Sequence, residues 1–325
     1  MNIVRRSPFV NLLSLAAIIA ATALRAHFMP YPAETVADTA TFIGARLSAW
    51  QQTHPLAAAC AACPIWFAAG WIVGLVVRVR ELYFVRTTIT MPLYGIAACG
   101  IFCAHDSLAA AVASLLFASA MRSLADSLRN GYSFSPLFFG SLCTGLLPLV
   151  YAPAVTLMLT VPLAVVMFKR SAREAIVALT GLMFGPLAVC YLHWGTGGDF
   201  VQPLAQSLDA LTAVSGYRFF GSLTVGAALT AGCLLAALLA AALFVGANIY
   251  AMNSRARYIT FFNMCAAAVA LSTLAMPSST PSAFGLIAVP TAMTIPSLLV
   301  QIRSQAANAI YAVLSVLFVL HLIIC

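Results

Sequence analysis

Charged residues are scarce in this chain: Lys, Arg, Asp and Glu make up 7% of its 325 residues, whereas hydrophobic residues make up 63%. An ordinary soluble domain carries roughly 25% charged residues, so a soluble globular fold is excluded. Period-2 alternation of apolar and polar residues is also lacking, which argues against a membrane β-barrel. The unbroken apolar runs, such as 227–247, instead predict membrane-spanning helices, because a helix satisfies its own backbone hydrogen bonds in a bilayer.

The apolar windows predict an all-α, polytopic transmembrane bundle that forms a single domain over residues 1–325. We place a corner at Pro148, Tyr151 and Pro153, because proline interrupts helices and favours turns. The N-terminal run resembles a secretory signal, but it continues to Phe28 and many spans follow, so we expect an uncleaved first helix. The eleven expected spans are 8–28, 56–77, 88–104, 107–121, 134–149, 152–168, 175–193, 222–250, 259–276, 283–300 and 307–325.

The positions of Lys and Arg predict the orientation of the bundle. If the N-terminus is cytoplasmic and the C-terminus periplasmic, every Lys and Arg except Arg25, Arg46 and Arg218 falls on the cytoplasmic side. Short cytoplasmic loops retain such residues, so this distribution supports both the eleven spans and the orientation of a multi-pass membrane protein. The net charge of +8 then reflects contact with membrane lipids and not with nucleic acid, because no basic stripe is interleaved with aromatic residues.

The two longest predicted loops, 29–55 and 194–221, both fall on the outer face. Each contains apolar residues at helical spacing, which predicts an amphipathic helix lying on the membrane surface. These residues are Val36, Ala40, Ile43, Leu47 and Trp50 in the first loop and Val201, Leu204, Leu208 and Leu211 in the second.

Charged residues of the outer face are candidates for a functional site. Glu34 and Asp38 lie one helical turn apart, and either carboxylate is a candidate for a catalytic base. The alternative is that the two residues form an ordinary solvated face of a helix. The candidates for binding a charged substrate are Arg25, Arg46, Asp199 and Asp209.

All five histidines also fall on the outer face. His105 and Asp106 occupy a tight turn, and with His54 and His193 they are candidates for acid/base catalysis or for binding a divalent metal. No HExxH or comparable spacing supports a metal site, and packing or interfacial histidines are the alternative.

Cysteine spacing offers a separate hypothesis. Cys60 and Cys63 form a C-x-x-C pair, and Cys99 and Cys103 lie one helical turn apart, both near the outer ends of spans. Two such dithiols suit a membrane thiol oxidoreductase. The alternative is that these cysteines pack as small apolar residues in Ala-rich helices.

No Asp, Glu, Lys or Arg lies near the centre of a predicted span, which disfavours an ion-coupled transporter. Pro290 and Pro296 could still break a helix as transporters do. The main polar side chains within the spans, from which we expect helix-to-helix hydrogen bonds, are Asn11, Asn248, Asn263 and Asn308.

The run 138–189 resembles an uncharacterised family of polytopic inner-membrane proteins of Bacteroidota. The similarity rests on a Tyr-x-Pro corner, a basic elbow with Arg-Glu, and a Gly-x-x-x-x-Pro pattern in the next span. In this chain these are Tyr151, Pro153, Arg173, Glu174, Gly181 and Pro186. The resemblance implies a Gram-negative inner membrane and supplies no catalytic residues.

The layout of the chain is similar to that of membrane glycosyltransferases that use polyprenyl-phosphate sugars. That resemblance implies that a carboxylate of an outer loop, here Glu34 or Asp38, acts as a base or binds a metal, and that Arg25 or Arg46 pairs with phosphate. The leading hypothesis is therefore envelope glycan or glycolipid assembly from a polyprenyl-linked substrate. A non-catalytic membrane scaffold, a thiol oxidoreductase and a transporter remain alternatives, and the sequence names no protein partner.

Overall fold

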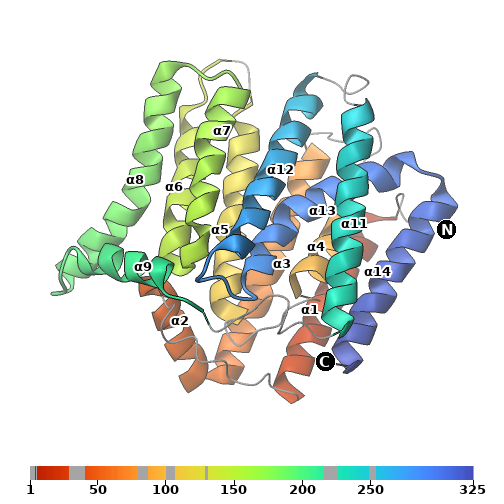
Figure 1. Ribbon diagram of the computed structural model, residues 1–325, viewed down its shortest axis with the longest axis horizontal. Coiled ribbons are helices and arrows are strands. Elements are labelled where there is room, and N and C mark those ends of the chain that lie inside the picture. The colour runs from red at the N-terminus through yellow and green to blue at the C-terminus, as the bar shows by residue number, and fades with distance from the viewer. Residues whose placement is uncertain are drawn as a thin grey trace.

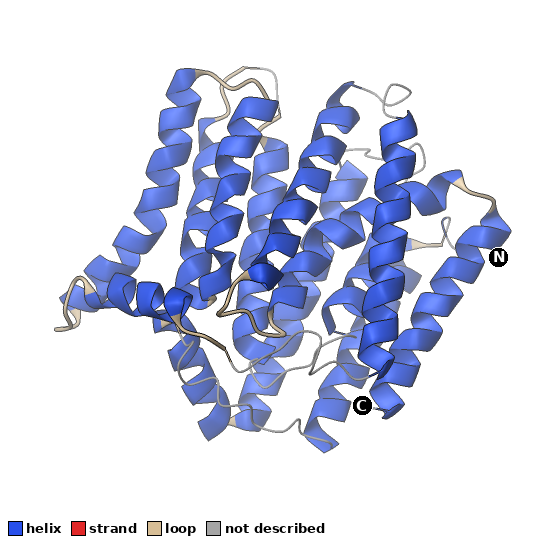
Figure 2. Ribbon diagram, in the orientation of Figure 1, coloured by secondary structure: helices blue, strands red, loops and turns tan. Residues whose placement is uncertain are grey.

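The computed structural model is an all-helical bundle (Figures 1 and 2). It describes residues 4, 6–28, 41–79, 87–99, 107–128, 131–215, 225–248 and 254–324, and within these ranges it contains no strand. The helices are α1 (Pro8–Phe28), α2 (Phe42–Thr53), α3 (Pro55–Val79), α4 (Thr90–Cys99), α5 (Ser107–Asp126), α6 (Phe134–Val150), the 3-10 helix η3 (Ala152–Leu159), α7 (Thr160–Met167), α8 (Ala172–Gly195), α9 (Gln202–Thr212), α11 (Val225–Asn248), α12 (Ser254–Ser272), the 3-10 helix η5 (Thr273–Ala275), α13 (Ala283–Gln301) and α14 (Ser304–Ile324).

Eight of the described helices are long and apolar enough to cross a membrane. The predicted class, a multi-pass helical membrane protein, is therefore confirmed, while the count of eleven spans stays a prediction. The apolar helices over Phe134–Val150 and Ala152–Met167 are shorter. The expected span 88–104 is represented by α4, which has only 10 residues. At 1.5 Å per residue the described part of this span, α4, covers about 15 Å, half of a bilayer core, and the expected residues 100–104 lie outside the described residues.

The predicted corner between two spans is present at Tyr151. Its backbone is extended, and α6 ends just before it. The Tyr151 hydroxyl donates to Thr280 O at 3.2 Å and accepts from Thr280 N at 3.0 Å, which anchors the corner to the segment before α13. Pro148, however, lies inside α6, and Pro290 and Pro296 lie inside a continuous α13, so these prolines do not break their helices.

The first and last described helices run in the same direction. Near their starts, the Arg6 guanidinium lies 5.9 Å from the centre of the Tyr311 ring, and near their ends Arg25 Nε donates to Leu322 O at 3.1 Å. The start of α1 and the end of α14 consequently lie at opposite ends of this helix pair. An odd number of crossings requires this arrangement.

Most described Lys and Arg residues lie at the end of the bundle where α1 begins, which we call the basic end. Arg25 and Arg46 lie at the opposite end, which also carries α2 and α9 and which we call the α2/α9 end (Figure 1). The separation matches the charge distribution from which the orientation was predicted. The residues of the basic end are Arg6, Arg78, Arg122, Lys169, Arg170, Arg173, Arg255, Arg257 and Arg303.

A buried carboxylate organises the elbow between α7 and α8. Glu174 is only 3% exposed and accepts hydrogen bonds from Ser133 N at 2.9 Å, Ser171 N at 3.0 Å and Arg170 Nη1 at 3.2 Å. Ser171 in turn caps the start of α8. The elbow is thereby joined to the start of α6. Arg170 and Glu174 therefore stabilise the turn between α7 and α8.

The helices α6 and α8 touch through glycines. A Cβ atom on Gly145 would collide with Leu182 O, and one on Gly181 would lie 2.6 Å from Phe138 O. Small residues allow such close approach of helix backbones, which is a main source of helix association in lipid, where no hydrophobic effect drives it.

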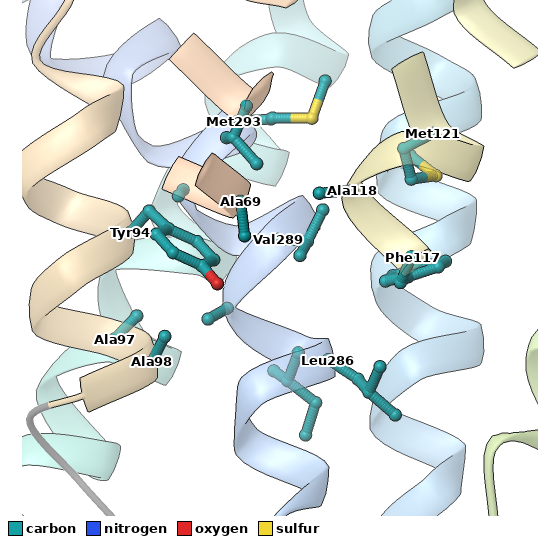
Figure 3. Packing of buried hydrophobic residues seen from close by; sticks show 14 of the residues in the cluster. Ala69, Tyr94, Ala97, Ala98, Phe117, Ala118, Met121, Leu286, Val289 and Met293 are labelled. Atoms are coloured by element: carbon teal, nitrogen blue, oxygen red, sulfur yellow. The ribbon is translucent and has the colours of Figure 1, made fainter. Parts of the chain in front are cut away.

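The helix α13 forms the centre of the bundle, because 94% of its most apolar stretch is buried. Figure 3 shows Val289 of α13 facing Ala69 of α3, Tyr94 of α4 and Ala118 of α5. The fully buried Tyr94 hydroxyl lies 2.7 Å from Ser114 Oγ, which donates to Gly285 O at 2.9 Å. Buried hydroxyls are thus paired across helices.

Two of the asparagines hydrogen-bond to a distant segment, Asn263 to a second helix as predicted and Asn11 to the turn before α4. Asn11 Nδ2 donates to Thr88 Oγ1 at 2.8 Å, and Asn263 Nδ2 donates to Pro290 O at 3.0 Å and to Thr294 Oγ1 at 2.7 Å. Asn248 differs from expectation, because its Nδ2 donates to Phe244 O within its own helix.

The contact between α6 and α8 leads to a test. Gly145→Ala should lower the free energy of unfolding by about 1–3 kcal/mol, because the new methyl group meets backbone that cannot move away easily. Gly232→Ala on α11 is the matched control, since nothing lies within 4 Å of its Cβ position. It should have little effect or stabilise by up to about 1 kcal/mol. Unfolding in detergent micelles measures both, and equal stabilities would contradict the close contact.

Candidate functional site

A short helix, α2, lies at the α2/α9 end of the bundle. Thr41 caps it by accepting a hydrogen bond from Gly44 N at 3.2 Å. Ile43 and Leu47 pack against the core, as the sequence pattern predicts, and Trp50 is 40% exposed. A helix is therefore present over the second half of the predicted stretch, and its lying on the membrane surface stays a prediction. Glu34 and Asp38, as well as Val36 and Ala40, lie outside the described residues.

The second predicted surface helix is α9, which follows α8 closely. Its small residues Pro203, Ser207 and Ala210 are buried. The large apolar Leu208 and the preceding Val201 are 62% and 57% exposed, so they face away from the bundle. This is the arrangement expected of a helix whose apolar side meets lipid and not protein.

Four side chains join α2, α8 and α9 in what we call the junction cluster: Phe42, Arg46, His193 and Gln202. The Phe42 ring is 5% exposed, and the Arg46 guanidinium carbon lies 4.2 Å from its centre. The His193 ring meets the same phenyl ring edge-to-face, with 4.9 Å between centroids. His193 Nε2 and Gln202 Oε1 are 2.8 Å apart and share a hydrogen bond.

The junction cluster holds the cationic side chain of Arg46 at the surface, next to a phenyl ring that other helices fix in place. Arg46 is exposed, while the ring beneath it is buried and fixed by a histidine from a different helix. Gly198 makes room for that histidine, because a Cβ atom there would collide with the His193 ring. The arrangement suits binding of an anion, since the exposed guanidinium keeps N–H donors within reach of a ligand.

The other charged candidates do not join the cluster. Arg25 donates to the end of α14, and Asp199 Oδ1 accepts from Val201 N at 3.4 Å just before α9. Asp209 is exposed on α9. Of the proposed substrate-binding residues, the described contacts place Arg46 in the junction cluster.

The described histidines contact aromatic rings or are buried. His54 packs against Trp50 with 6.3 Å between ring centroids, and His321 is 3% exposed. Among the described residues no group of three or more His, Cys, Asp or Glu side chains could hold a metal ion. His105 and Asp106 lie outside those residues, so the divalent-metal hypothesis for them stays a prediction.

The C-x-x-C pair lies near the start of α3. Cys60 is exposed, Cys63 is partly buried against the core, and both thiols are free. The side chain of Cys99 and all of Cys103 lie outside the described part of the structure, so the second dithiol stays a prediction.

Sequence reasoning did not identify Phe42 or recognise why Gln202 matters. Neither Phe42 nor Gln202 belongs to the apolar spacings that predict the two surface helices. Their roles depend on contacts with His193 on α8. No local pattern reports such contacts between distant segments.

Comparison with protein-family models, with curated proteins and with solved structures returned no match. The fold and the apolar helices define the class: this chain is a multi-pass α-helical membrane protein.

The junction cluster predicts that His193 fastens α9 to the bundle. His193→Ala removes a hydrogen bond and an edge-to-face contact, worth about 1–2 kcal/mol together, so hydrogen exchange in Gln202–Thr212 should accelerate about tenfold. His54→Ala is the control, because its ring contact is with Trp50 on the neighbouring turn of α2. Unchanged exchange in α9 of the His193 variant would show that the contact does not hold this helix.

Proposed function

We propose that the protein acts in the assembly of envelope glycans or glycolipids from lipid-linked sugars, at the outer face of the bacterial inner membrane. The observation that carries this proposal is the junction cluster. It places an exposed arginine, supported by three helices, at the end of the bundle away from the basic loops. A site for a lipid-linked sugar requires a cation at headgroup depth, and an arginine matches phosphate geometry.

The reaction proposed is glycosyl transfer. A hydroxyl of the acceptor attacks the anomeric carbon of the sugar, the bond from that carbon to the phosphate oxygen breaks, and polyprenyl phosphate leaves with the electron pair. Glu34 or Asp38 accepts the proton of the attacking hydroxyl. The sequence supports this assignment, because both carboxylates shortly precede Arg46 along the chain.

A non-catalytic scaffold is the second candidate, and the surface of α11 favours it. Ala228, Gly232, Ala236 and Ala240 are exposed at a spacing of four residues, and nothing lies within 4 Å of the Cβ position of Gly232. Small residues at this spacing allow close packing with another membrane helix.

The test is the profile of envelope glycolipids and glycoproteins in a deletion strain. It is complemented at matched protein levels with the wild type, with Glu34→Ala plus Asp38→Ala, or with Cys60→Ser plus Cys63→Ser. We expect a glycan to be lost on deletion and restored by the wild type and the cysteine variant but not by the carboxylate variant.

Each other result has a distinct meaning. An unchanged profile on deletion would contradict a role in glycan assembly. Full restoration by the carboxylate variant would show that Glu34 and Asp38 are not catalytic, and it would support the scaffold hypothesis. Failure of the cysteine variant alone would favour the thiol oxidoreductase.

A further inference from the structure

The turn that ends α7 holds a lysine in a backbone conformation that favours glycine. Lys169 has a φ of +51°, and among the described residues no other non-glycine residue has a positive φ. Lys169 N donates to Val166 O at 3.1 Å, and Arg170 N donates to Val165 O at 2.9 Å. This pair of hydrogen bonds forms a Schellman motif, in which glycine is the usual residue at the left-handed position. Because the Cβ atom of an L-residue crowds its own carbonyl there, Lys169 makes the turn less stable than a glycine would.

The charges of Lys169 and Arg173 are not paired within the described part of the chain. Both side chains are exposed. The carboxylate of this elbow, Glu174, is buried and already accepts from Arg170 Nη1 at 3.2 Å. Ser171 fixes the start of α8 between them with a capping box. The elbow therefore presents two unpaired cations from a turn that a buried ion pair holds in place.

The elbow borders the surface of the bundle that meets lipid. The helix α8 lies at one edge of the bundle (Figure 1). Ile176 and Met183, three and ten residues after Arg173 and on the same face of α8, are 65% and 49% exposed. Val166, shortly before Lys169, is 74% exposed. Large apolar side chains exposed on the helices of a membrane bundle contact acyl chains, so the two cations lie next to an acyl-chain surface.

Two stacked aromatic rings lie beside the same turn. Tyr132 and Phe134 are 65% and 41% exposed, and their rings are parallel to within 8° with 5.2 Å between centroids. Ser133, which lies between them, is buried, and its N–H donates to Glu174 at 2.9 Å. Exposed aromatic side chains at the ends of membrane helices mark the headgroup layer. The rings therefore place the cations of the elbow at the depth of lipid headgroups.

We propose that the elbow binds one anionic phospholipid, with its phosphate at Lys169 and Arg173 and its acyl chains along the exposed faces of α7 and α8. The occupant is a lipid and not a soluble anion, because the cations border an apolar surface of the same two helices. Lys169 has a specific role in this site: its charge contributes to binding at a position where glycine would stabilise the fold. The site lies at the end of the bundle opposite the junction cluster, and the inference is independent of the proposed function.

The experiment measures binding of phosphatidylglycerol to the full-length protein by native mass spectrometry from detergent micelles, with phosphatidylcholine for comparison. Lys169→Gly should weaken binding of the first phosphatidylglycerol about fivefold, the loss expected for one cation near a lipid phosphate, and should leave phosphatidylcholine binding unchanged. The same substitution should leave the denaturant midpoint of unfolding unchanged or raise it, because glycine relieves the left-handed backbone. A lysine with a merely structural role would not give weaker binding together with undiminished stability.

Three further variants test the role of charge. Lys169→Arg should bind as the wild type does, because the charge is retained, and Arg173→Gln should weaken binding about fivefold. Arg303→Gln is the matched control and should leave binding unchanged. Arg303 is also exposed at the basic end, but it lies just before α14, at the opposite edge of the bundle from α8 (Figure 1).

The results that would overturn the proposal are specific. Unchanged phosphatidylglycerol binding in both Lys169→Gly and Arg173→Gln would show that the elbow is not the site. An equal loss in Arg303→Gln would show that net charge alone, and no particular site, attracts the lipid. Glycerol 3-phosphate, which has the phosphate but no acyl chains, should not displace the lipid at millimolar concentration, and displacement would overturn the assignment to a lipid.

Discussion

The close contact between α6 and α8 is the interaction on which both ends of the protein depend. At Gly145 and Gly181 the two backbones touch, so neither helix can rotate or slide without collision. One end of α8 then carries Glu174 to the start of α6, and the other carries His193 to the ring of Phe42. A single rigid pair of helices therefore positions the elbow at the basic end and the junction cluster at the α2/α9 end.

Polar and charged side chains are accommodated differently in the interior and at the two ends of the bundle. In the described interior, neutral hydroxyls and amides bond across helices, as Tyr94 does to Ser114, because a charge in hydrocarbon is strongly disfavoured. At the basic end a carboxylate is buried but surrounded by donors. At the α2/α9 end the guanidinium of Arg46 remains exposed next to the ring of Phe42, so it is available to a ligand.

The sequence predicted the parts of the fold that depend on local composition. Long apolar runs identified the spanning helices, and spacings of three and four residues located α2 and α9. Proline was a poorer guide, because Pro148 lies inside a helix while the corner forms at Tyr151. The junction cluster could not be predicted, since it brings together residues from three separate segments whose packing no local pattern encodes.

The account depends most on which end of the bundle faces the periplasm, because a lipid-linked sugar used at the outer face must meet the α2/α9 end. Alkaline phosphatase, which is active only outside the cytoplasm, can be fused after Gly197 or after Arg170, at the two ends of α8. The account predicts an active enzyme after Gly197 and an inactive one after Arg170. The reverse pattern would place the junction cluster in the cytoplasm and contradict the account.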